Sequence, residues 1–244
     1  MASFNPGPFG GARPFPLDYG RSTPDSVVRS FFNQVYAWMC AGLATTALVA
    51  WWVSTQPQLM AKIFRGPALL ILLVVELVLV GVISAAVRKI NATAATLLFM
   101  LYSALNGLTL SVIFLVYTQA SLASTFLVSA GVFGAMSVWG MFTKADLTRF
   151  GSLLFMALIG LVIASVVNIF FASSALYWLI TYAGVLIFVG LTAYDTQKLK
   201  ELAMQIGEDG AMAARYSVSG ALTLYLDFIN LFLLLLRLMG DRRR

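Results

Sequence analysis

Ionisable side chains are rare inside the apolar stretches of this sequence, and these few are the first candidates for chemistry. Glu76, Asp195, Asp227 and Arg237 stand within long hydrophobic runs or at their ends. A charged side chain at the centre of a bilayer costs at least about 2.5–3.5 kcal/mol on insertion scales. Each of them is therefore a candidate functional residue until a structural role is found.

Two aspartates carry most of this interest. Asp227 lies about eight residues after Ser219, or about 12 Å along a helix, and Asn230 shares its helical face. Asp195 lies about 5 Å inside the point where hydrophobicity gives way to Lys198. Structural alternatives exist for both, an interfacial anchor for Asp195 and an interhelical hydrogen bond for Asp227.

The apolar runs that carry these aspartates are consecutive and antiparallel, and both acids fall near the loop around Gly207 to Ala214. We therefore expect the two carboxyl groups to face each other. Two carboxyls in a low-dielectric site cannot both ionise cheaply, so they would share one proton and titrate as a unit. Such a pair could serve as a pH sensor, a cation site or a catalytic dyad.

Glu76 stands near the middle of its run, and Arg88 follows about three turns later at the edge. This spacing is too long for a contact between the two. Arg88 could instead pair with Asp195 and hold it ionised. Alternatively, Arg88 and Lys89 anchor the end of their helix in the headgroup layer.

The composition indicates the kind of element that positions these residues. Hydrophobic residues make up 60% and charged residues 11% of the chain, with a mean hydropathy of +0.89, against about 45–50% and 25% in soluble domains. We therefore expect an all-α integral membrane protein whose principal partner is the lipid bilayer. The net charge of +6 suits anionic headgroups, and nucleic acid is not an expected partner. The absence of histidine excludes His-based triads and zinc sites.

Seven apolar runs are long enough to cross a bilayer about 30 Å thick. A Gly- and Pro-rich stretch without the apolar segment of a signal peptide precedes them. We expect residues 1–28 to form a disordered cytoplasmic tail and residues 29–241 a seven-helix transmembrane domain. The runs extend over Phe31–Val53, Pro67–Val87, Ala94–Tyr117, Leu122–Phe142, Phe150–Phe171, Leu176–Tyr194 and Ser219–Met239.

The distribution of basic residues predicts the orientation of the chain. With seven crossings, ten Lys and Arg residues fall on the N-terminal side and six on the other. The positive-inside rule then favours a cytoplasmic N-terminus and an external C-terminus. The basic ending Arg242 to Arg244 favours the opposite orientation. A last segment that only dips into the membrane, or an even number of crossings, would remove the conflict.

Four stretches of the sequence resemble the Bax inhibitor-1 family, and its bacterial members in particular. They are Ser103–Gly107, Asn168–Phe170, Tyr194–Gln197 and Leu224–Phe232, of which the last is the most specific. The resemblance implies a seven-helix fold whose last helix is wrapped by two three-helix layers, in the inner membrane of a bacterium. It also implies a calcium leak that pH controls through paired aspartates.

The resemblance assigns roles residue by residue. Asp195 and Asp227 match the family's aspartate pair by motif, while Glu76 and Arg88 resemble its second-helix acidic residue and the arginine that follows. Calcium prefers six to eight oxygen ligands, so two carboxylates and Asn230 predict only a weak, transient calcium site. Weak binding suits a leak, because an ion held tightly does not leave. Calcium is thus the expected permeant ion, and no cofactor is expected.

Two other functions fit parts of the sequence. Intramembrane aspartyl proteases also carry Tyr-Asp on one helix, as at Tyr194 and Asp195, but their second aspartate follows a Gly-x-Gly motif. Here the residues before Asp227 are Leu224, Tyr225 and Leu226, which favours a protein that is not an enzyme. The other alternative is a non-conducting membrane regulator that binds a membrane protein of the protease, stress or cell-death machinery.

Overall fold

The computed structural model describes residues 24–86 and 89–243. Over these residues the chain is helical apart from short connections and one isolated β-bridge. Seven of the helices are long and apolar enough to cross a membrane. The helices are α1 (Pro24–Ser54), α2 (Pro57–Phe64), α3 (Ala68–Ala86), α4 (Ala92–Leu110), α5 (Ile113–Val116), α6 (Gln119–Phe142), α7 (Thr148–Phe171), α8 (Ser174–Ile206) and α9 (Gly210–Met239).

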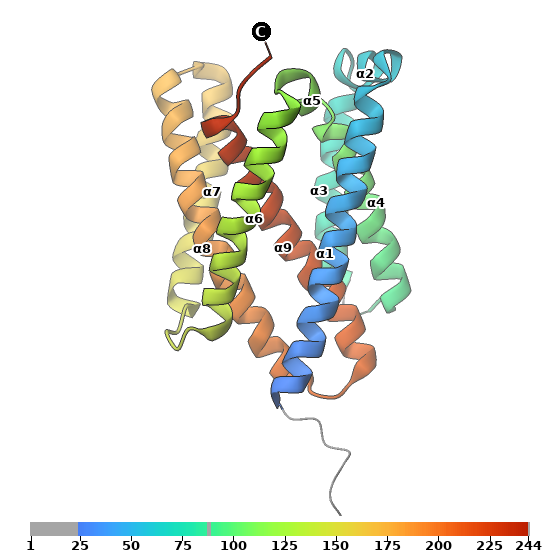
Figure 1. The fold of residues 1–244 in the computed structure, drawn as a ribbon, viewed down its shortest axis with the longest axis vertical. Coiled ribbons are helices and arrows are strands. Elements are labelled where there is room, and N and C mark those ends of the chain that lie inside the picture. Colours follow the sequence, from blue (N-terminus) through green and yellow to red (C-terminus); the bar gives the residue numbers. More distant parts are fainter. Residues whose placement is uncertain (1–23, 87–88, 244) are drawn as a thin grey trace, which may run out of the picture.

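Helix α9 occupies the centre of the bundle (Figure 1). It packs against α1 and α4 on one side and against α6 and α8 on the other. In its most apolar stretch 61% of the residues are buried, against 0% in α7 at the periphery. These contacts separate α1, α3 and α4 from α6, α7 and α8, with α9 between the two layers. The expected fold class is confirmed.

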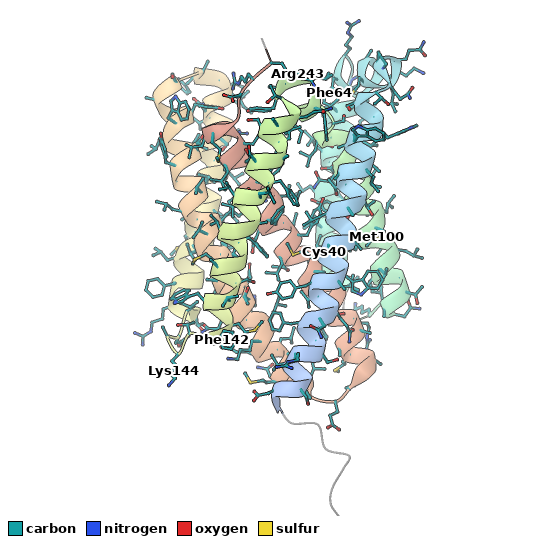
Figure 2. All side chains as sticks on the ribbon, in the orientation of Figure 1. Cys40, Phe64, Met100, Phe142, Lys144 and Arg243 are labelled. Carbon is teal, nitrogen blue, oxygen red and sulfur yellow. The ribbon has the colours of Figure 1, made fainter. Side chains whose placement is uncertain are left out.

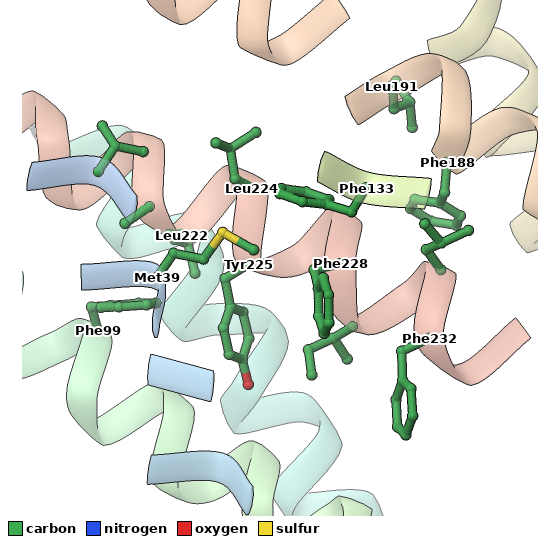
Figure 3. Packing of buried hydrophobic residues seen from close by; sticks show 14 of the residues in the cluster. Met39, Phe99, Phe133, Phe188, Leu191, Leu222, Leu224, Tyr225, Phe228 and Phe232 are labelled. Carbon is green, nitrogen blue, oxygen red and sulfur yellow. The ribbon is translucent and has the colours of Figure 1, made fainter. Parts of the chain in front are cut away.

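Large side chains fill the space around α9 (Figure 3). The Tyr225 ring meets the Phe99 ring edge to face, with centroids 5.7 Å apart, and the Phe228 ring meets the Phe133 ring in the same way at 5.6 Å. Tyr225 therefore contacts the first layer and Phe228 the second. Since aromatic rings fill large, irregular spaces, these contacts set the position of α9 between the layers.

The predicted boundaries of two runs are wrong. The sixth run was expected to end at Tyr194, but α8 continues to Ile206, and α9 begins at Gly210 rather than Ser219. The extension of α8 is amphipathic, with Leu199 and Ala203 buried against the core. Hydropathy marks the part of a helix inside lipid, whereas helical hydrogen bonding continues as long as one face is packed.

Two short features interrupt the predicted pattern. The third run, expected to be continuous from Ala94 to Tyr117, breaks into α4 and α5 at Ser111, whose hydroxyl bonds to the Leu108 carbonyl at 2.6 Å. Helix α2 was not predicted because it lies between two apolar runs. It packs Met60 and Ile63 against Val53.

The ends of the bundle bear on the predicted tail and the orientation. Helix α1 begins at Pro24, so residues 24–28 of the expected tail are helical, while residues 1–23 lie outside the described part of the chain. Figure 2 shows Lys144 at the end of the bundle where α1 begins and Arg243 at the opposite end. The continuous α9 thus carries the C-terminus to the other side. Which side is cytoplasmic stays a prediction.

Candidate functional site

The structure brings Asp195 and Asp227 together. Asp195 projects from α8 and Asp227 from α9, and their carboxyl groups are close enough for a side-chain hydrogen bond. Asp227 is buried, with 5% of its surface exposed, and its Oδ2 atom has no hydrogen-bond partner among the described residues. Lys198, one turn further along α8, interacts electrostatically with Asp195. The pair therefore combines one enclosed carboxyl and one carboxyl with a nearby cation.

Close helix packing positions the aspartate-bearing part of α8. A Cβ atom at Gly140 of α6 would collide with the Ala193 carbonyl, and one at Gly151 of α7 would collide with the Tyr194 ring. Only glycine lets both helices approach α8 this closely, as is common for helix contacts in lipid. The packing of α6 and α7 thus sets the position of the residues that directly precede Asp195.

Both aspartates line a groove of about 1020 Å³ between α7, α8 and α9. Its walls are mainly apolar, with Asn230 one turn beyond Asp227, Lys198 toward one end and Arg237 toward the other. Asn230 donates its amide hydrogen to the Leu226 carbonyl at 2.8 Å. Asn230 therefore shares the groove with the pair, as expected from its helical face.

A second, smaller cavity of about 360 Å³ also contacts Asp195. It lies between α8 and α9, toward the loop that connects them. Its lining is more polar, and Asp195 contributes to the lining of both cavities. The polar residues that line it are Lys198, Glu201, Gln205, Tyr216, Ser219 and Thr223.

Glu76 belongs to a different cluster, and the structure does not bring it to the aspartates. Its Oε1 atom accepts a hydrogen bond from Thr109 Oγ1 at 2.5 Å. On α4, Asn106 donates to the Tyr102 hydroxyl at 3.3 Å, and the ring of Tyr102 meets that of Tyr225 edge to face at 5.8 Å. We call Glu76, Tyr102, Asn106, Thr109 and Tyr225 the glutamate cluster. Any support that Glu76 gives to the aspartates must act through α9.

Arg88, the expected partner of Asp195, lies outside the described residues. The expected calcium ligands are sparse. Among the residues that the structure describes, no three His, Cys, Asp or Glu side chains come together as a metal site would require. The aspartate pair with Asn230 offers few oxygen ligands, which suits only loose binding of a hydrated cation.

Sequence reasoning missed the hydroxyl-bearing members of the glutamate cluster. Tyr225 lies two residues before Asp227, which turns it to the opposite face of α9, and Thr46 bonds to its hydroxyl at 2.7 Å. Threonine and tyrosine are ordinary in membrane helices, so no composition signal distinguished them. The two-residue spacing from Asp227 was the available clue.

Comparisons with known proteins bear on this arrangement. The model of a family described as "Inhibitor of apoptosis-promoting Bax1" matches residues 28–244. The inner membrane protein YbhL of Escherichia coli K12 is 54% identical over 231 residues, which cover 94% of this chain and 99% of YbhL. An uncharacterized protein of Borreliella burgdorferi is 45% identical over 89% of this chain and 94% of its own length. An uncharacterized membrane protein of Streptococcus pyogenes is 40% identical over 88% of this chain and 94% of its own length.

Proposed function

This chain belongs to the Bax inhibitor-1 family of membrane proteins, and from that premise we propose that it is a pH-regulated cation leak channel, with calcium as the permeant ion. Asp195 and Asp227 are the proposed pH sensor and part of the ion pathway. The family is consistent with a membrane channel or a membrane regulator, and the proposal selects the channel. The relationship to YbhL favours the bacterial inner membrane as its location, with the N-terminus in the cytoplasm.

One observation carries the proposal, the unpartnered Oδ2 of Asp227 beside a second carboxyl. A buried acceptor without a partner costs about 1–3 kcal/mol, and more if it is charged. A proton or a cation bound at the pair would relieve this cost. Protons and cations would therefore compete for the carboxyl oxygens of this pair.

The surroundings of the aspartate pair suit an ion that passes through better than an ion that stays bound. The small polar cavity lies between α8 and α9 on the side of their loop and reaches Asp195, which also lines the larger groove. A calcium ion at the pair would keep part of its hydration shell, because the described residues offer too few oxygens to replace it. Weak binding allows the ion to leave, which a conducting site requires.

The decisive experiment measures calcium flux through purified protein in liposomes as a function of pH. Asp227→Asn keeps the shape of the side chain but removes its titration, so the pH dependence should disappear. Glu76→Gln is the matched control, because it neutralises a membrane carboxyl that lies on the other side of α9. An unchanged pH profile in Asp227→Asn would refute the pair as the sensor.

The second candidate is a non-conducting regulator that binds a membrane protein of the protease, stress or cell-death machinery. The description of the family model, an inhibitor of an apoptosis-promoting protein, favours it. In that case the aspartates would only specify how α8 and α9 pair. Purified protein that carries no calcium under any pH would favour the regulator over the channel. No enzyme activity is proposed, because Leu224 and Leu226 obstruct the approach of a substrate backbone to Asp227.

A further inference from the structure

The large groove extends well beyond the aspartate pair. On α7 it is lined from Thr148 to Ile169, which is about 30 Å of helix and matches the hydrocarbon thickness of a bilayer. On α9 it is lined from Thr223 to Arg237, about 21 Å. The aspartates occupy one part of this length. The remainder needs another explanation.

The groove exists because α7 packs on α8 and stands apart from the rest of the bundle. Contacts such as Gly151 against Tyr194 and Gly190 against Leu154 hold α7 to α8. Val162 and Val166 of α7 then face the groove rather than a helix, with 55% and 50% of their surfaces exposed. Apolar walls at this depth require an apolar occupant.

A lipid chain is the apolar occupant that the bilayer itself supplies. The groove holds about 1020 Å³ and runs along the apolar lengths of α7 and α9. A flexible hydrocarbon chain adapts to such a space and reaches it directly from the surrounding bilayer.

The end of the groove near Arg237 carries a positive charge, which favours an occupant with a negative group at that end. Arg237 is exposed, and its guanidinium carbon lies 5.7 Å from the centre of the Tyr177 ring. Trp178 and Tyr182 stack beside Tyr177, with centroids 6.0 Å apart, in the manner of aromatic residues at a membrane–water interface. A guanidinium at this level binds the phosphate of a lipid headgroup by paired hydrogen bonds.

We propose that this groove binds an anionic phospholipid, with its phosphate at Arg237 and one acyl chain between α7 and α9 toward Asn230. The apolar walls and the cation at the interfacial end together match an amphiphile with a negative headgroup. The lipid site rests on Arg237 and on the apolar walls of α7 and not on the aspartates, so its test is separate from the test of the proposed channel.

Trp178 provides a direct readout because it lies next to Tyr177 at the proposed headgroup position. A protein with Trp178 as its sole tryptophan is made by replacing the other four with phenylalanine. It is then placed in phosphatidylcholine vesicles with brominated phosphatidylglycerol or, separately, brominated phosphatidylcholine as the quencher. We expect phosphatidylglycerol to bind about five times better than phosphatidylcholine, the preference that one basic residue near a surface confers.

Two sets of variants test the headgroup and the chain. Arg237→Gln should abolish the preference and Arg237→Lys should retain part of it, whereas Arg65→Gln, at the same end of the bundle, should leave it unchanged. Val166→Phe fills the groove and should weaken quenching by lipids brominated on the chain, while Val167→Phe, next to it but outside the lining, should not.

Several results would overturn the site. Equal quenching by the two lipids in the parent protein would mean that no anionic lipid is selected. An equal loss in Arg65→Gln and Arg237→Gln would indicate a general surface charge. Quenching that falls as the protein-to-lipid ratio rises would indicate that a second copy of the chain covers the groove. If Arg237→Gln does not fold, the lysine and Val166 variants decide the question.

Discussion

Two polar clusters lie on opposite faces of α9, and their carboxyl groups differ in hydrogen bonding. On the first-layer side, Glu76 accepts a short hydrogen bond from Thr109, and tyrosine and asparagine side chains surround it. On the second-layer side, Asp227 meets Asp195 and keeps one oxygen without a partner, in a groove. The carboxyl of Glu76 is thus hydrogen-bonded between helices, whereas that of Asp227 keeps an acceptor free.

The difference arises from two neighbouring residues. Tyr225 and Asp227 are two positions apart on α9, which turns their side chains to opposite sides of the helix. Tyr225 is fully buried and bonds to Thr46 of α1, while Asp227 faces α8. The same central helix therefore carries a hydrogen-bonded cluster on one face and a carboxyl with an unpartnered oxygen on the other.

The largest effect is expected where packing positions the aspartates. Gly140→Ala places a methyl group against the Ala193 carbonyl of α8, two residues before Asp195. Overpacking of this kind costs about 1–3 kcal/mol, so the melting temperature in detergent should fall clearly. Gly131→Ala on the same helix has open space at its Cβ and is the control. Equal melting temperatures would mean that α6 does not set the position of α8.

A smaller loss is expected on the other face of α9. Thr109→Val removes the donor to Glu76 and leaves a buried carboxyl unpaired, at a cost of about 1–2 kcal/mol. Thr181→Val is the control, because Thr181 bonds only to the Tyr177 carbonyl of its own helix at 2.8 Å. Thermal unfolding of both variants checks the prediction. If Thr109→Val is as stable as Thr181→Val, the glutamate cluster is not held by this hydrogen bond.

Neutralising one member of the aspartate pair should raise the stability of the fold, whereas the two preceding substitutions lower it. Asp227→Asn removes the cost of keeping a proton on a buried carboxyl at neutral pH, so we expect a gain of up to about 1 kcal/mol. The gain should vanish at acidic pH, where this aspartate is protonated in the unfolded chain as well. Glu76→Gln keeps an acceptor for Thr109 and should change stability little. A loss in Asp227→Asn similar to that in Thr109→Val would mean that the aspartates are also a structural cluster.

The smallest effect is expected at Asp146, an exposed carboxylate between α6 and α7 that serves as a reference for the buried ones. Hydrogen bonds from the Thr148 side chain and backbone, together with the charge of Arg149, lower the pKa of Asp146. A lowered folded-state pKa adds stability above the unfolded pKa, and this contribution is lost as pH falls through the folded pKa. Thr148→Ala should raise the pKa of Asp146 toward its ordinary value.

An NMR titration of Asp146 in detergent micelles measures this shift, with Ser152→Ala as the control because its hydroxyl bonds to the Arg149 carbonyl at 3.1 Å. An unchanged midpoint in Thr148→Ala would assign the lowered pKa to the backbone and to Arg149. Little change in overall stability is expected, since water screens an exposed charge.

Much of the fold was predictable because lipid imposes a simple rule on sequence. A membrane helix needs about 20 apolar residues, and all seven runs correspond to long apolar helices. The ends were less predictable. The extension of α8 to Ile206 and the short helix α2 depend on packing outside the apolar runs, where hydropathy carries no signal.

The candidate site was predictable in part. Asp195 and Asp227 stood out because charges are rare in apolar runs, and consecutive antiparallel helices place them at the same depth. The separate position of Glu76 and the course of the groove were not predictable. Helices such as α7 are apolar on every side, so their sequence does not show which face meets a neighbour and which meets lipid.

The sequence by itself determined the number of long apolar helices, the scarcity of buried charge and the position of each acid along its helix. These follow from length and hydropathy, which act on each helix separately. Only the tertiary structure decided that Asp227 meets Asp195 while Tyr225 meets the glutamate cluster, and that α7 leaves a groove beside α9. The physical reason is that contacts between membrane helices depend on shape, close glycine approaches and single hydrogen bonds, none of which changes the hydrophobic pattern.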